Sequence, residues 1–132
     1  MEKGRNLVRA NGMPKVMVIE DDANMFSLLQ MLLELEGYEV VLWEGGDNIR
    51  QIVDEICQEK PELILMDVHL RHLNGFEVLS ALKTKSELEE VKVLIASGVD
   101  MAKRSKEEGA DGFIQKPFMP DELINEIHKT IN

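Results

Sequence analysis

Short apolar runs alternate with amphipathic segments along most of the chain. The most continuous run, Leu63 to Met66, leads directly into Asp67. A run of this length is typical of a strand that is buried on both faces of a sheet. Comparable runs predict four further strands. The expected strands are 16–19, 38–43, 62–67, 91–96 and a short one within 109–115.

The segments between these runs have helical periodicity. Gly37 is a stop signal for the first helix, the Gly45-Gly46 pair breaks the second strand, and Asp47 can cap the second helix. The sequence 86–89 (SELE) fits a capping box that adds one helical turn. The expected helices are 23–36, 48–59, 76–85, 100–108 and 120–131.

Five strand–helix units with short connections predict an α/β fold, in which a parallel sheet is covered by helices on both faces. The length of 132 residues indicates one domain. Residues 1–13 are polar and lack periodicity. We therefore expect a flexible tail or an added leader at 1–13 and the folded domain at 14–132.

Composition and charge exclude several classes of function. The net charge of −10 argues against direct nucleic-acid binding by this domain, because that binding needs clustered Lys and Arg. The single cysteine, Cys57, suits a reducing compartment and falls on the apolar side of the second helix, so we expect a buried structural thiol. No apolar run approaches the roughly 20 residues that span a membrane, and no signal-peptide pattern is present. A cytoplasmic protein without membrane contact is expected.

Reactive side chains follow the expected strands at their carboxyl ends. They are Glu20, Asp21 and Asp22 after the first, Asp67 at the end of the third, Ser97 after the fourth and Lys116 after the fifth. In the usual doubly wound strand order these ends meet at one edge of the sheet, where open α/β sheets bind ligands. The sequence therefore predicts one cleft that contains acids, a hydroxyl and a lysine.

This set of side chains favours phosphoryl chemistry. Crowded carboxylates repel one another, and Mg²⁺ relieves that repulsion through oxygen ligands while it also binds phosphate. Carboxylates are known nucleophiles that form acyl phosphates, so we expect Asp67 to accept a phosphoryl group. Lys116 would pair with one phosphate oxygen and Ser97 would donate a hydrogen bond to another.

Four stretches of the chain carry a family resemblance. They are VMVIEDD at 16–22, LILMDVHLRHLNGFEVL at 63–79, VLIASG at 93–98 and GADGFIQKPF at 109–118. In this order and spacing they resemble the receiver domain of bacterial two-component response regulators, including chemotaxis regulators, over about residues 14–132. The resemblance implies a flavodoxin-like (βα)5 fold whose five-stranded parallel sheet has the order 2-1-3-4-5.

The resemblance also implies roles for individual residues. Glu20 and Asp21 would be the acid pair that binds Mg²⁺, the backbone carbonyl of His69 would complete the protein ligands, and Asp67 would be the phosphoacceptor. The other implied roles are the switch hydroxyl Ser97, the phosphate-binding Lys116, the switch aromatic Phe113 and a cis Lys116-Pro117 peptide.

The implied function is a signalling switch. A histidine kinase or a histidine phosphotransfer protein would phosphorylate Asp67, and the change would pass to a partner-binding face on the fourth helix, fifth strand and fifth helix. The domain would catalyse only its own phosphorylation and dephosphorylation. On the fourth helix, Lys103, Arg104 and Lys106 are expected to form a solvated face that a partner contacts.

Two departures from the family pattern affect the expected site. Receivers often have a proline four residues after the phosphoacceptor, and Arg71 occupies that position here. We therefore expect a less rigid loop and added positive charge near the mouth of the pocket. His69 and Val99 occupy positions that tune the dephosphorylation rate, which the sequence does not specify.

Three alternatives stay open at this point. The first is that the domain is one part of a larger regulator with a DNA-binding or enzymatic output. A Mg²⁺-dependent phosphohydrolase would need a second acid two residues after its nucleophile, where this chain has His69. A flavin binder would need a Ser-, Thr- or Gly-rich loop after the first strand, where this chain has three acids that repel phosphate.

Overall fold

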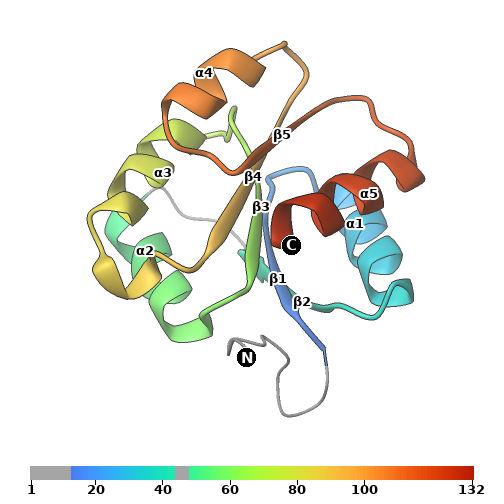
Figure 1. Cartoon of the computed structure of the whole chain (residues 1–132), viewed down its shortest axis with the longest axis horizontal. Helices are drawn as coiled ribbons and strands as arrows, with labels where there is room; N and C mark the ends of the chain where they lie inside the picture. The colour runs from blue at the N-terminus through green and yellow to red at the C-terminus, as the bar shows by residue number, and fades with distance from the viewer. Residues whose placement is uncertain (1–12, 44–47) are drawn as a thin grey trace.

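The computed structural model describes residues 13–43 and 48–132, which form a central parallel sheet with helices on both faces (Figure 1). The strand order is β2-β1-β3-β4-β5, and every neighbouring pair is parallel. This flavodoxin-like order confirms the expected fold. The strands are β1 (Lys15–Ile19), β2 (Glu39–Trp43), β3 (Leu63–Asp67), β4 (Lys92–Ser97) and β5 (Gly112–Gln115).

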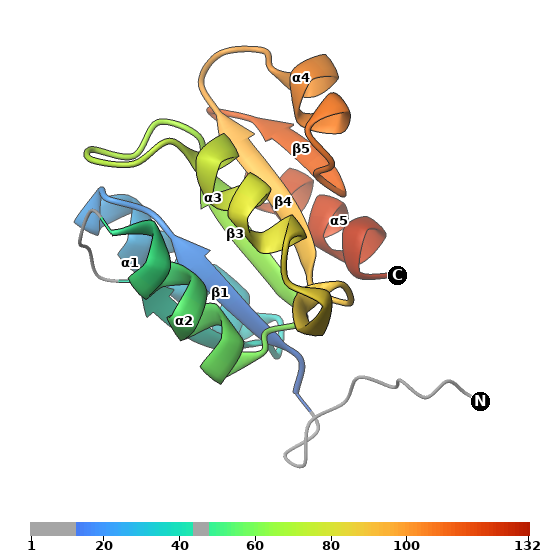
Figure 2. The ribbon, with the colours of Figure 1, turned by 90° about the vertical axis from the view of Figure 1, so that its left-hand side faces the viewer.

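Helices α2 and α3 cover one face of the sheet and α1 and α5 cover the other, while α4 lies beside β5 (Figures 1 and 2). Each of the first four helices carries the chain back from the carboxyl edge of the sheet toward the amino edge, as connections between parallel strands require. The helices are α1 (Ala23–Leu35), α2 (Ile49–Glu59), α3 (Gly75–Lys83), α4 (Ala102–Glu107) and α5 (Pro120–Ile131), with a 3-10 helix, η1, at Ser86–Leu88.

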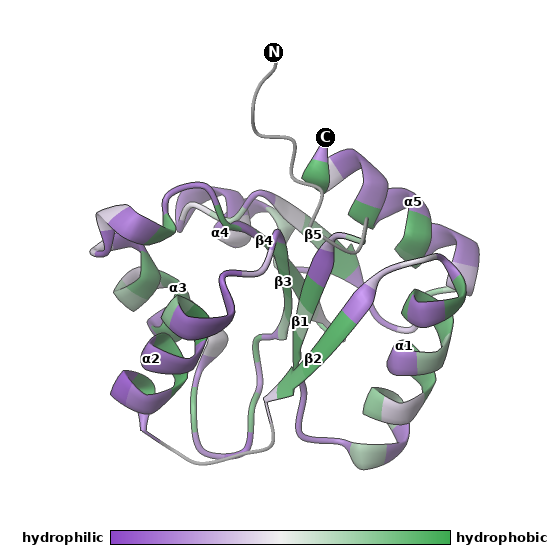
Figure 3. Ribbon diagram, turned by 90° about the horizontal axis from the view of Figure 1, so that it is seen from below, coloured by the Kyte–Doolittle hydropathy of each residue, from purple (hydrophilic) through white to green (hydrophobic). Residues whose placement is uncertain are grey.

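Strand periodicity divides the core into two layers. Met17 and Ile19 of β1 pack under α2 and α3, whereas Val16 and Val18 pack under α1 and α5. All four residues from Leu63 to Met66 are buried, which confirms that β3 is covered on both faces. Figure 3 shows the consequence, with apolar strands inside and polar residues on the outer faces of most helices.

Local sequence signals explain where α1 begins and ends. The Asp22 side chain caps α1 by accepting hydrogen bonds from the backbone N–H groups of Asn24 (2.9 Å) and Met25 (3.1 Å). Gly37 follows the same helix with a φ of +93°, a left-handed conformation that glycine adopts without strain. The expected stop of the first helix is confirmed.

Other expectations were wrong in detail. The N-cap of α2 is Asn48, whose side chain accepts from the N–H of Gln51 at 3.3 Å. Gly45, Gly46 and Asp47 lie outside the described residues, as does most of the predicted tail, residues 1–12. The extra turn predicted at 86–89 forms as η1, but the capping box does not, because Ser86 is the first residue of η1 and Lys85 precedes it as the cap. Helix α4 is shorter than predicted, and β4 includes Ser97.

Cys57 is half-buried on α2, not buried as predicted, and packs at the margin of the core under α2 and α3. Burial, followed by the nearby Glu87 carboxylate, raises the pKa of its thiol. A raised pKa disfavours the reactive thiolate, so a structural role is retained.

The outer face of α1 carries an apolar stripe that the periodicity did not predict. Leu28, Met31 and Leu35 are 43%, 54% and 78% exposed at helical spacing. Contiguous exposed apolar side chains often mark a protein–protein contact.

Within residues 13–43 and 48–132, the helices lack the length and the apolar character that crossing a membrane requires.

The tight junction between β3 and α3 yields the first testable prediction. A Cβ on Gly75 would lie 2.7 Å from the carbonyl oxygen of Asp67 and 3.0 Å from the Cα of Val68. Gly75→Ala should lower the free energy of unfolding in urea by about 1–3 kcal/mol, because backbone must move to admit the methyl group. Gly98→Ala is the matched control, since no heavy atom lies within 4 Å of its Cβ position. Equal losses in the two variants would contradict this explanation.

Candidate functional site

The acids and the lysine predicted to form the site meet in one open cavity at the carboxyl edge of the sheet, with a volume of about 620 Å³. Strand register produces this meeting, because Ile19 of β1 pairs with Met66 of β3 and the reactive residues follow directly. The polar residues that line the cavity are Glu20, Asp21, Asp22, Asp67, His69, Arg71 and Lys116.

Lys116 joins the acids of two strands. Its ammonium nitrogen lies 3.1 Å from Oε1 of Glu20 and 3.3 Å from Oδ2 of Asp67. The backbone N–H of Lys116 donates to the carbonyl of Ser97 at 2.8 Å, and the Lys116-Pro117 peptide is cis, as the resemblance implied. Burial alone would lower the pKa of Lys116, but Asp67 and then Glu20 outweigh it, so the pKa is raised. The cavity therefore holds a protonated cation between two acids at neutral pH.

The acid pair after β1 is tied to its surroundings. The Glu20 side chain is only 7% exposed, and its Oε2 accepts a hydrogen bond from the N–H of Asp22 at 3.1 Å. The Asp21 carboxylate accepts a hydrogen bond from the backbone N–H of Arg71, on the loop that follows β3. The two loops at this edge are thus linked across a long distance in sequence.

The β3–α3 loop is well organised, although Arg71 replaces the usual proline. His69 and Asn74 form an isolated antiparallel bridge, and Leu70 and Leu73 are partly buried against the core. The N–H of His69 also donates to Oδ1 of Asp67 at 3.4 Å. These contacts place the loop over the phosphoacceptor candidate without proline.

Ser97 and Phe113 lie next to this cavity but do not line it. Ser97 is fully buried at the end of β4, and its Oγ accepts from the N–H of Val99 at 3.1 Å. Phe113 is half-buried on β5 and packs against the core under α2 and α3. The structure therefore brings together the acids and the lysine, and places the hydroxyl and the aromatic ring on the adjacent strands.

The donor set suits a hard cation. Four carboxylates line the cavity, and three of them, those of Glu20, Asp21 and Asp67, are candidate ligands together with His69, because Mg²⁺ prefers oxygen ligands. Among the described residues, no three acid, histidine or cysteine side chains are already arranged around one point. The physical reason is that Lys116 holds Glu20 and Asp67, while the N–H of Arg71 holds Asp21.

Two contacts at this end of the molecule had no signal in the sequence. The link between Asp21 and Arg71 joins residues 50 positions apart, so no local pattern predicts it. Arg104 is exposed, as predicted, and its guanidinium also lies 4.5 Å from the centroid of the Phe76 ring, which is a cation–π distance. Lys103 and Lys106 are exposed, as predicted.

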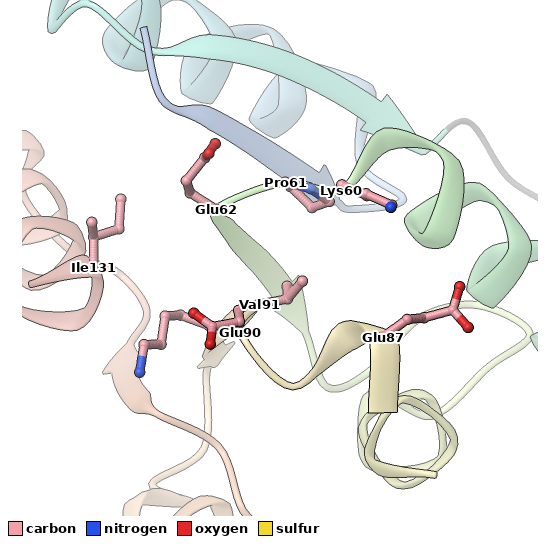
Figure 4. A pocket seen from close by; sticks show the side chains of 8 residues that line it. Lys60, Pro61, Glu62, Glu87, Glu90, Val91 and Ile131 are labelled. Carbon is pink, nitrogen blue, oxygen red and sulfur yellow. The ribbon is translucent and has the colours of Figure 1, made fainter. Parts of the chain in front are cut away.

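A second hollow lies at the opposite edge of the sheet (Figure 4). It has a volume of about 170 Å³ and is lined by side chains of both charges around Pro61, Val91 and Ile131. It lies at the amino ends of the strands, and in open α/β sheets ligands bind at the carboxyl ends. The acidic cavity is therefore the candidate site.

Comparison with known proteins identifies the family of this chain. A family model described as "Response regulator receiver domain" matches residues 16–128. The Escherichia coli K12 protein "Transcriptional regulatory protein CpxR" is 33% identical over 116 residues, which cover 87% of this chain and 48% of CpxR. The chain spans about half the length of the curated relatives that it matches.

Solved structures show the same fold. The receiver domain from Bermanella marisrubri superimposes with a TM-score of 0.80 at 25% identity, covering 91% of this chain and 99% of that one. The chemotaxis response regulator CheY4 of Vibrio cholerae superimposes with a TM-score of 0.79 at 23% identity, covering 89% and 98%.

The Lys116 contacts predict a pH-dependent effect on stability. Lys116→Met should lower the free energy of unfolding at pH 7 by about 1–3 kcal/mol, because the largely buried Glu20 loses its counter-charge. The folded-state pKa is raised above 10.5, so this stabilisation is complete below pH 10.5 and is lost as pH rises through the folded-state value. Urea unfolding of both proteins should give a constant difference from pH 7 to about 9 and a smaller one near pH 11. A difference that grows with pH would contradict this assignment.

Proposed function

The chain belongs to the family of response regulator receiver domains, and we propose that it is a phosphorylation-activated switch whose phosphoacceptor is Asp67. The observation that carries the proposal is the position of the Lys116 ammonium, 3.1 Å from Glu20 and 3.3 Å from Asp67 at the carboxyl edge. A lysine between acids in an open cavity suits a site that receives a charged phosphoryl group.

In the proposed reaction an Asp67 carboxylate oxygen forms a bond to phosphorus, and the bond from phosphorus to the donor breaks. Membership of a two-component family implies a histidine kinase as the partner. We propose that the donor is phosphohistidine on a kinase or on a phosphotransfer protein, so the imidazole nitrogen leaves with the electron pair. Lys116 already contacts Asp67 and would hold an oxygen of the transferred group.

The carboxylates of Glu20, Asp21 and Asp67 and the backbone carbonyl of His69 would hold Mg²⁺, which when bound supplies positive charge beside the phosphoryl oxygens. Because Lys116 and the N–H of Arg71 now satisfy these carboxylates, metal binding would compete with both contacts. Glu20 would then exchange the Lys116 ammonium for the metal, and Asp21 would exchange the N–H of Arg71 for it.

We assign the switch to Ser97 and Phe113. The phosphoryl group would draw the Ser97 hydroxyl away from Val99, and Phe113 would move further into the core. Helix α4 is suited to respond, because it has six residues and its N-cap, Met101, carries no conventional oxygen acceptor. Among the described residues, the buried Ser105 hydroxyl of α4 lacks a hydrogen-bond partner, so the packing of this helix leaves a buried polar group unsatisfied.

The output would be a shift in population between two arrangements of the α4–β5–α5 face, each favoured by different contacts. A downstream protein or an output domain would bind that face. The printed name of CpxR describes a transcriptional regulator, and the matched relatives are about twice as long. A receiver within a larger regulator with a DNA-binding output is therefore one form of the proposal, and a stand-alone regulator is the other.

The first test is intact-mass analysis after incubation with acetyl phosphate and Mg²⁺. Wild type should gain one phosphoryl adduct, and Asp67→Asn should gain none, because an amide is not a nucleophile of this kind. Asp22→Ser is the control, since it removes a neighbouring carboxylate but keeps an oxygen acceptor at the N-cap of α1. Equal labelling of wild type and Asp67→Asn would exclude Asp67 as the phosphoacceptor.

The second test concerns the switch. After phosphorylation, hydrogen exchange of backbone amides in α4 and β5 should change in wild type. Ser97→Ala should still be phosphorylated, but its exchange change should fall to about half or less, because the hydroxyl that follows the phosphoryl group is missing. Ser97→Thr keeps that hydroxyl and should retain the response. A full response in Ser97→Ala would refute the assigned role.

A further inference from the structure

Arg71 lies at the mouth of the acidic cavity. It lines the cavity from the β3–α3 loop and is exposed to solvent. Its backbone N–H donates to the Asp21 carboxylate, which fixes the residue beside the acid pair. Within residues 13–43 and 48–132, its guanidinium makes no ion pair. Among the residues that the structure describes, Arg71 thus carries an unpaired positive charge and lines the same cavity as the proposed phosphoacceptor.

The loop around Arg71 is held in place. The bridge between His69 and Asn74 closes its base, and Leu70 and Leu73 pack against the core on either side of the tip. Figure 2 shows this loop, between β3 and α3, as a narrow projection beyond the carboxyl edge of the sheet. A charge on such a loop remains near the cavity and loses little entropy when a ligand arrives.

A phosphoryl donor meets an electrostatic barrier here. Four carboxylates line the cavity and the chain carries a net charge of −10, so an anion is repelled as it approaches. Lys116 is already engaged by Glu20 and Asp67. Arg71 is the other guanidinium or ammonium among the cavity-lining residues that the structure describes.

We infer that Arg71 attracts small anionic phosphoryl donors of the acyl phosphate class into the cavity and so accelerates phosphorylation of Asp67. This inference rests on the proposed function. With acetyl phosphate, an Asp67 oxygen bonds to phosphorus while the bond between phosphorus and the acetyl oxygen breaks, and acetate leaves with the electron pair. Arg71 exchanges no proton. It acts on the encounter between the anionic donor and the cavity. It therefore changes the rate of phosphorylation but not the number of phosphoryl groups transferred.

The test is the initial rate of adduct formation at acetyl phosphate concentrations below saturation. Arg71→Gln removes the charge but keeps the backbone N–H that holds Asp21. Its second-order rate constant should fall about three- to tenfold. Arg71→Lys keeps the charge and should remain within about twofold of wild type. At about 1 M salt, where charges are screened beyond roughly 3 Å, wild type and Arg71→Gln should converge.

Lys129→Gln is the matched control, because it makes the same change in net charge on an exposed residue near the end of α5. It should react at the wild-type rate. An unchanged rate in Arg71→Gln, or an equal loss in Lys129→Gln, would overturn the inference.

A second measurement separates this inference from the proposed function. Binding of inorganic phosphate, followed by NMR shifts of residues around the cavity, does not require phosphoryl transfer. It should be weaker in Arg71→Gln than in wild type, and equal binding would overturn the role of Arg71. If wild type gains no adduct but the phosphate result holds, the proposed phosphoacceptor fails and the role of Arg71 in attracting anions stands.

Discussion

The contact on which the site depends is that of one ammonium group with two carboxylates. Lys116 lies between Glu20 and Asp67, and each of these three residues follows or ends a different strand. Without a cation, the acids at this edge would repel one another, and the raised pKa of Lys116 expresses how strongly they favour its charged form. The same arrangement prepares the cavity for a phosphoryl group, which brings its own negative charge and needs the same cation.

Strand register brings Lys116, Glu20 and Asp67 together. Parallel pairing of β1, β3, β4 and β5 brings the ends of distant segments to one edge. The glycine at 75 lets α3 begin directly against the carbonyl of Asp67, so the phosphoacceptor candidate lies at a rigid junction. On the other side, α4 is short and its buried Ser105 hydroxyl is unsatisfied among the described residues. The tight β3–α3 junction at Asp67 lies beside a short helix with an unsatisfied buried hydroxyl. This combination suits a protein in which a charge change at Asp67 alters the surface around α4.

Much of this could be predicted from the sequence, because the governing signals are local. The apolar run before Asp67 identified a strand buried on both faces, and Gly37 marked the end of α1. The contacts of Arg71 with Asp21 and of Arg104 with Phe76 could not be predicted, because they join segments that are far apart in the chain. The SELE segment forms the predicted turn without its capping box, because Ser86 takes a helical position in η1 and Lys85 takes the cap position.

The account is tested most directly by locating the modification. The protein would be phosphorylated by a histidine kinase, treated with borohydride, which reduces an acyl phosphate of aspartate to homoserine, and digested for peptide mass spectrometry. The account predicts homoserine at position 67 and unmodified acids at Glu20 and Asp21. Homoserine elsewhere, or a stable phosphoryl adduct with Asp67 intact, would contradict it.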